Sequence, residues 1–207
     1  LTSETIYLLQ APFTYYQKYG VSSSNLSSLP TPFVDAFGNT TDASLHCNKY
    51  IYSYIKRKHI DDKLRQKSPF TVQGWFYIEE DSTSDSNLRY IWRNGRGYNF
   101  YSIATKNMYF TMYVNGVGEK LRAPTPLTTN KWYYFALSQD ITNTVRLYLS
   151  DGDTGTATFV GSFVSTYTCL DNDQETFIGE GLVGYVSNIK ESQNALYTAD
   201  GDVSYTK

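Results

Sequence analysis

The chain has 207 residues, which suits one domain with its own buried core, or one domain plus an arm, and argues against a multidomain enzyme. Its net charge of -2 argues against a general nucleic-acid binder, because neutralising phosphates requires a basic face. The sequence has no apolar run of 18 residues and no basic, apolar start typical of a signal peptide, so we expect no membrane insertion. The 20 Tyr and 11 Phe, with only 18% charged residues, indicate a strand-rich protein.

Residues 1–30 are interrupted by Pro, Gly and a Ser-rich run, which predicts an N-terminal arm or linker followed by one domain over residues 31–207. Because the chain begins with Leu1, we expect a processed product or a piece of a longer polypeptide. The arm carries enough apolar side chains that we expect part of it to dock on another surface. A strand is expected over residues 49–55. The basic run at residues 56–58 is interpreted as a solvated connector, or alternatively as a surface for an acidic partner.

From Pro69 onward, short runs of alternating apolar and polar residues are separated by Gly, Asn and Asp clusters. Such spacing predicts two antiparallel sheets packed face to face, and the absence of a clear long helical pattern excludes a doubly wound α/β fold. Within this pattern Phe135 and Leu137 are expected to face the core, while Tyr134 and Tyr148 point to the other face of the sheet. The nine expected strands span residues 70–78, 88–92, 98–104, 107–114, 131–138, 144–149, 158–163, 175–178 and 184–191.

Several of these segments carry motifs in a characteristic order: PFTVQGWF at 69–76, NKWYYFAL at 130–137, VRLYLSDG at 145–152, and later segments at 177–179, 182–189 and 194–197. In this order and spacing they resemble the laminin-G-like branch of the concanavalin A-like lectin and glucanase superfamily. The resemblance implies an all-β, two-sheet antiparallel jelly roll that holds saccharides on one outer sheet face or at its bounding loops. The fold alone does not decide the function.

Catalysis is not expected. Glycoside hydrolysis needs paired carboxylates, and the glucanase branch carries them as Glu-x-Asp-x-x-Glu. The nearest match begins at Glu79 and has Ser84 where the catalytic acid is required, with Asp85 one residue too late. A dyad of His46 and Cys47 is excluded because adjacent side chains on a strand point apart. We therefore predict that the protein is not an enzyme.

No cofactor is expected, although calcium stays an alternative because related domains often bind it through oxygen ligands. The positions that match the metal-binding strand of the family hold Ser187 and Asn188 rather than an acid. Two further questions remain open at this stage. Cys47 and Cys169 either pair in a disulfide or are two buried thiols. The remaining oxygen-rich clusters are read as turns or as calcium ligands: Asp35/Asn39/Asp42, Asp151/Asp153 and Asp171/Asn172/Asp173/Glu175.

Glycan binding needs an exposed aromatic ring that stacks on a sugar, with hydrogen-bonding neighbours that fix the hydroxyls. Such residue types concentrate at one predicted turn, and two tyrosines on the next strand extend the group. The alternative is that Trp92 fills the core and the arginines are solvated. The candidate ligand-binding residues are Trp92, Arg93, Asn94, Arg96, Tyr98, Tyr109 and Tyr113.

The sequence thus predicts a non-catalytic recognition or attachment module that binds a glycan or cell-surface ligand, together with other subunits of a larger extracellular, cell-surface or virion assembly. The alternative is a purely structural capsid or fibre component that docks through residues 1–30. A glycoside hydrolase is the third hypothesis, which the missing carboxylate argues against.

Overall fold

The computed structural model describes most of the chain beyond residue 69 and four short strands before it. The well-described segments are residues 69–80, 88–94, 101–114, 118–152, 154–166 and 175–205, with backbone strands at 5–9, 21–24, 45–47 and 54–58. Within these segments there are strands and turns only, and no helix is long and apolar enough to cross a membrane.

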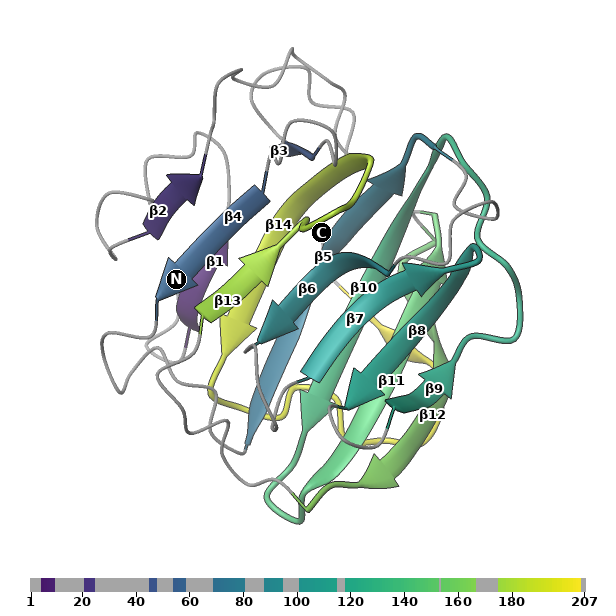
Figure 1. Cartoon of the computed structure of the whole chain (residues 1–207). Helices are drawn as coiled ribbons and strands as arrows, with labels where there is room; N and C mark the ends of the chain where they lie inside the picture. Colours follow the sequence, from purple (N-terminus) through teal and green to yellow (C-terminus); the bar gives the residue numbers. More distant parts are fainter. Residues whose placement is uncertain are drawn as a thin grey trace.

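Two antiparallel sheets form the molecule (Figure 1), as the sequence pattern predicts. In the first sheet the strand order is β1-β14-β5-β10-β11-β12-β15, and β3 also pairs with β14. Its strands are β1 (Thr5–Leu9), β3 (Leu45–Cys47), β5 (Phe70–Ile78), β10 (Lys131–Gln139), β11 (Thr144–Asp151), β12 (Thr156–Val164), β14 (Gly184–Ser192) and β15 (Val203–Ser204).

The second sheet has the order β2-β4-β13-β6-β7-β8-β9. Neighbouring strands in this order often lie far apart in the chain, as β4 and β13 do, so long-range pairing holds the sheet together. Its strands are β2 (Val21–Ser24), β4 (Tyr54–Lys58), β6 (Arg89–Asn94), β7 (Tyr101–Lys106), β8 (Tyr109–Val114), β9 (Gly118–Arg122) and β13 (Glu175–Ile178).

The main core lies between the sheets and follows from the alternation of side chains along each strand. On β5, every second residue from Phe70 to Ile78 points inward, except that Gly74 leaves room for Ile189 of β14. Phe135 and Leu137 of β10 are fully buried in this core, as predicted. Aromatic rings fill much of its volume, with Phe76 stacked on Phe110 at 5.7 Å between ring centroids. The abundant Phe and Tyr of the sequence therefore share this core with its aliphatic residues.

All nine strands predicted after residue 69 are present, and β5 and β13 have the predicted bounds. Two short strands in this part of the chain, β9 and β15, were not expected from the pattern. The basic run at residues 56–58 is not a connector, because it lies within β4 and pairs with both β13 and β2. The reason is that strand pairing depends on backbone hydrogen bonds, which a charged residue can form as well as an apolar one.

The described strands of the first thirty residues belong to the sheets. β1 pairs with β14 in the first sheet, and β2 pairs with β4 in the second. This part of the expected arm therefore docks on the sandwich of its own chain. The domain division at residue 30 stays a prediction.

Candidate functional site

The structure places Trp92 in the core and so corrects the expectation of an exposed stacking ring. A β-bulge between Tyr90 and Trp92 shifts the register of β6 against β7, so that Ile91 and Trp92 are both fully buried in the main core. The indole N–H of Trp92 donates a hydrogen bond of 2.8 Å to Oε1 of Glu191, a buried carboxylate on β14. Trp92 therefore links the two sheets from within.

The two residues that follow Trp92 are also engaged inside the protein. Asn94 is fully buried. Arg93 forms an ion pair with Glu180, and its guanidinium carbon lies 4.7 Å from the ring centroid of Tyr90 and 4.5 Å from that of Phe177. A guanidinium enclosed between two rings and a carboxylate holds the sheet surface together and has little capacity left for a ligand.

Tyr109 and Tyr113 lie on the outer face of β8, as the sequence predicts, and both rings are partly exposed. Arg122 of β9 covers the ring of Tyr109 at 5.1 Å, while the Tyr113 hydroxyl donates to Glu119 at 3.2 Å. Arg96 and Tyr98 lie outside the described residues. The structure thus separates Trp92 from the two tyrosines, and a role of this tyrosine group in binding stays a prediction.

Cys47 is buried in the main core, and burial raises the pKa of its thiol far above the usual value, with a smaller contribution from the nearby Glu79 carboxylate. Cys169 lies outside the described residues, so the disulfide stays a prediction. Across the described segments, no three His, Cys, Asp or Glu side chains gather into a group that could hold a metal ion. Most residues of the proposed calcium clusters lie outside those segments, and calcium binding also stays a prediction.

A row of four aromatic side chains, which the sequence analysis did not find, crosses the outer face of the first sheet. Strand register places His46 opposite Tyr185, Tyr185 opposite Tyr77, and Tyr77 opposite Trp132. Each ring comes from one of four neighbouring strands, β3, β14, β5 and β10. Figure 1 shows these strands side by side. We call this set, His46, Tyr185, Tyr77 and Trp132, the aromatic row.

The rings of the row contact one another in sequence. His46 stacks on Tyr185 at 4.6 Å between centroids, Tyr185 meets Tyr77 edge-on at 5.9 Å, and Tyr77 lies 5.5 Å from Trp132. Tyr185 is almost completely buried, whereas the other three side chains are partly exposed. The row therefore offers solvent three ring surfaces whose orientation is fixed by mutual packing.

Polar groups border the row. Nε2 of His46 lies 2.8 Å from Oε2 of Glu79, which follows the last residue of β5 and lies beside Tyr77. The Tyr77 hydroxyl donates to Oδ1 of Asn130 at 3.3 Å. Burial and then the Glu79 carboxylate raise the pKa of Tyr185 to about 12, so its hydroxyl stays protonated at neutral pH. Hydrogen-bonding groups and ring faces thus occur together, the combination that sugar recognition requires.

Glu79 is the first residue of the incomplete glucanase motif, and in the structure its carboxylate contacts His46 beside the aromatic row. Glu80, the next residue on the chain, contacts Arg89 at 3.7 Å instead. The remaining acids of that segment, Asp81 and Asp85, lie outside the described residues.

The C-terminal segment covers the rest of this outer face. The ring of Tyr205 stacks on Tyr134 at 4.0 Å and meets Trp75 edge-on at 5.5 Å. The Tyr197 hydroxyl bonds Tyr134 at 2.8 Å, and the Leu196 amide donates to Thr71 at 2.9 Å. Tyr134 and Tyr148 therefore point away from the main core as predicted, but they form a second buried cluster. The aromatic row lies beside this cluster, with Trp132 packed against it, and three rings of the row stay partly exposed.

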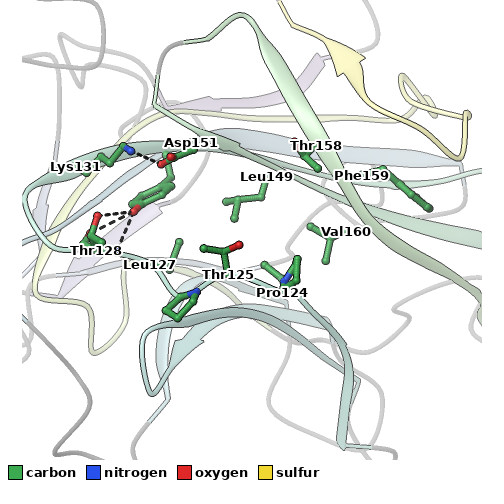
Figure 2. Close-up of a pocket in the computed structure, with 13 residues that line it drawn as sticks. Pro124, Thr125, Leu127, Thr128, Lys131, Leu149, Asp151, Thr158, Phe159 and Val160 are labelled. Atoms are coloured by element: carbon green, nitrogen blue, oxygen red, sulfur yellow. Dashed lines mark hydrogen bonds and ion pairs between the residues drawn. The ribbon is translucent and has the colours of Figure 1, made fainter.

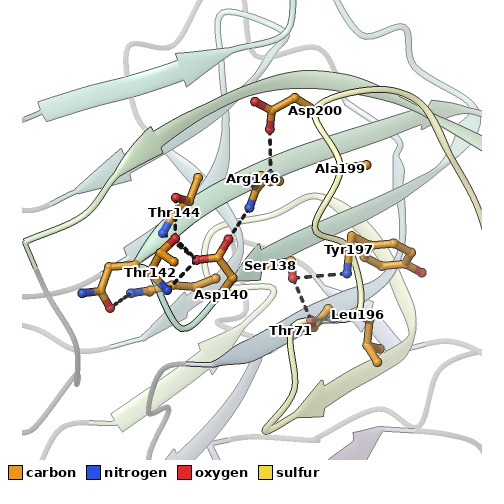
Figure 3. Close-up of polar contacts among 12 residues, drawn as sticks. Thr71, Ser138, Asp140, Thr142, Thr144, Arg146, Leu196, Tyr197, Ala199 and Asp200 are labelled. Carbon is orange, nitrogen blue, oxygen red and sulfur yellow. Dashed lines mark hydrogen bonds and ion pairs between the residues drawn. The ribbon is translucent and has the colours of Figure 1, made fainter.

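An ion-pair cluster holds the middle of the same segment, between Tyr197 and Tyr205 (Figure 3). Arg146 contacts both Asp140 and Asp200 at 2.7 Å. Burial raises the pKa of Asp140, but hydrogen bonds from Thr142, Arg146 and Thr144 outweigh it and lower the pKa to about 2. The carboxylate is thus stabilised in its charged form.

A pocket of about 280 Å³ opens where the connection from β9 to β10 passes beside β11 and β12 (Figure 2). Apolar side chains such as Leu127, Leu149 and Val160 line it. Several of its polar groups are paired with one another, since Lys131 contacts Asp151 at 2.5 Å and the Tyr133 hydroxyl accepts a bond from the Thr128 amide. An apolar lining offers few partners for sugar hydroxyls, so the aromatic row is the better candidate for a glycan.

Comparison with solved structures supports the fold. The binding domain of botulinum neurotoxin serotype D aligns with a TM-score of 0.67 at 14% identity, covering 94% of this chain and 48% of that chain. The binding domain of Paraclostridial Mosquitocidal Protein 1 aligns with a TM-score of 0.69 at 12% identity, covering 94% and 50%. The serotype D ligand-binding domain in complex with N-acetylneuraminic acid aligns with a TM-score of 0.59 at 15% identity, covering 86% and 43%.

The chain thus spans about half the length of these solved domains, and at such low identity the likeness shows the fold alone. No curated protein sequence matches the chain. A family match is found over residues 51–187, to the family described as the concanavalin A-like lectin/glucanases superfamily. Because this match spans well over half of the 207 residues, the chain belongs to the concanavalin A-like lectin/glucanases superfamily.

Proposed function

We propose that the chain is a non-catalytic glycan-recognition module of an extracellular, cell-surface or virion assembly, and that the aromatic row is its sugar-contacting surface. The observation that carries the proposal is the set of partly exposed rings of His46, Tyr77 and Trp132, bordered by the Glu79 carboxylate and the Asn130 amide. Ring faces stack on the C–H faces of sugars, and the polar groups bond the hydroxyls.

The pre-organisation of the row supports this function. Each ring is held by a neighbouring ring and by its strand, so little conformational entropy is lost when a ligand binds. Related folds serve as binding domains, and one of these solved domains is in complex with N-acetylneuraminic acid. Those ligands belong to those proteins, and they supply a precedent for the fold rather than a ligand for this chain.

The other two hypotheses have less support. Hydrolysis would need two cooperating carboxylates. Glu79 is instead bonded to His46, and Glu80 contacts Arg89. A structural role through residues 1–30 would need that segment to engage a neighbouring subunit, whereas β1 and β2 pair within this chain.

The test is a broad glycan array probed with the purified chain, with and without calcium, followed by two matched alanine variants. Trp132→Ala removes a ring of the aromatic row, and Tyr113→Ala removes a partly exposed ring from the other sheet. We expect saturable binding that Trp132→Ala abolishes and Tyr113→Ala leaves unchanged. Loss in Tyr113→Ala alone would move the site to the tyrosine group on β8, and a blank array for the folded chain would refute glycan recognition.

A further inference from the structure

We propose that the aromatic row binds an extended, uncharged oligosaccharide laid across the strands and disfavours acidic sugars such as a sialic acid; this inference rests on the function proposed above. The proposed function names a glycan in general, and the geometry and charge of the row narrow this to a class of glycan.

The length of the row argues for several consecutive sugar residues. The row crosses from β3 to β10, and three strand spacings at roughly 4.8 Å each give a length of about 14 Å. The centroid distances of 4.6, 5.9 and 5.5 Å between successive rings agree with this spacing. Three rings of the row are partly exposed, and one aromatic ring faces one pyranose ring, so a monosaccharide would leave two of the three rings unused.

The angles between the rings argue for a soluble, twisted chain rather than a flat polysaccharide surface. Tyr185 is almost completely buried, so the angle that a ligand meets between neighbouring rings is that of Tyr77 and Trp132, whose planes differ by 58°. A flat crystalline face can touch only rings that share a plane. A single oligosaccharide can rotate about each glycosidic bond, and it can therefore follow rings that turn along the row.

The charge of the surface argues against an acidic sugar. Glu79 is partly exposed beside the row, with 33% of its side chain accessible. Among the described residues, the positions that flank the row on the same face are Trp75, Tyr134 and Ser187, none of which is basic. Lys131 is engaged with Asp151 at the pocket on the other side of β10 (Figure 2). A ligand carboxylate would therefore lie near the Glu79 carboxylate, which His46 contacts at 2.8 Å, and the flanking residues named above supply no lysine or arginine to attract the ligand charge.

The experiment is isothermal titration calorimetry with linear oligosaccharides of defined length. The probes are neutral N-acetyllactosamine, β-1,3-glucan and β-1,4-glucan series of one to six residues, together with the lactosamine series capped by sialic acid. We expect affinity for at least one neutral series to rise over the first three or four residues and then level off. We expect the sialylated member of a bound pair to bind at least about tenfold more weakly.

Two charge-removing variants separate the effect of Glu79 from a general change of charge. Glu79→Gln should reduce the discrimination against the sialylated probe to about threefold or less, whereas Glu180→Gln, which removes the carboxylate paired with Arg93 of the other sheet, should leave it unchanged. Tighter binding of the sialylated probe would overturn the inference and leave the proposed function standing. Equal affinity for one and four residues would also overturn it. Failure of every probe to bind would refute the inference, and a blank array would refute the proposed function as well.

Discussion

Truncation of Trp92 tests the central difference between the sequence and the structure. An exposed stacking ring could be replaced by alanine with little loss of stability, whereas the structure shows a fully buried ring that bonds Glu191 between the sheets. Replacing a buried Trp by Ala costs about 3–5 kcal/mol in packing. Removing the indole donor from a buried acceptor adds about 1–3 kcal/mol. The sum is a large part of the roughly 5–15 kcal/mol that typically separates folded from unfolded domains.

The assay is urea unfolding of the parent, Trp92→Phe, Trp92→Ala and Trp132→Ala proteins, followed by circular dichroism. Trp92→Phe keeps most of the ring volume and should fold, with a loss of about 1–3 kcal/mol that reports mainly the bond to Glu191. Trp132 is only partly buried, so Trp132→Ala should cost less than Trp92→Ala. The reasoning would be refuted if Trp92→Ala unfolded within about 0.5 kcal/mol of the parent, the range typical of surface substitutions.

Three further predictions concern other contacts of the fold. The pKa of Asp140 is about 2 in the folded protein, against an ordinary value of 3.8, so the stability that its bond to Arg146 supports is present above about pH 4 and is lost as the pH falls through 2. In Asp140→Asn the midpoint of urea unfolding should decrease less over this pH range than in the parent, and an equal decrease would contradict the prediction. Tyr205→Phe removes a buried hydroxyl and should lower the free energy of unfolding by about 1 kcal/mol in the same assay. An unchanged free energy of unfolding would mean that the C-terminal segment is not docked. A Cβ at Gly184 would lie 1.9 Å from the carbonyl oxygen of Tyr77, so Gly184→Ala should lower the melting temperature sharply and weaken glycan binding. The control is Gly155→Ala, where a Cβ meets nothing within 4 Å and only the positive φ adds some strain. Equal melting temperatures of the two variants would show that β14 and β5 are not so closely paired.

The aromatic row could not be predicted from the sequence, because its four residues lie on separate segments. His46, Tyr77, Trp132 and Tyr185 are separated by tens of residues, and each looks like an ordinary strand residue in its own segment. Only the register of β3, β14, β5 and β10 aligns them. Alternation does indicate that Tyr77 and Trp132 point away from Phe76 and Tyr133, and that was the signal available in the sequence.

The sequence by itself determined the all-β sandwich, the bounds of β5 and β13, and the inward direction of Phe135 and Leu137, because alternation along a strand is a local property. Tertiary structure decided what each outer face does. A bulge in β6 turned Trp92 into the core, and the C-terminal segment buried Tyr134 and Tyr148. Both outcomes depend on which distant segments pack together, and local sequence patterns carry no information about that pairing.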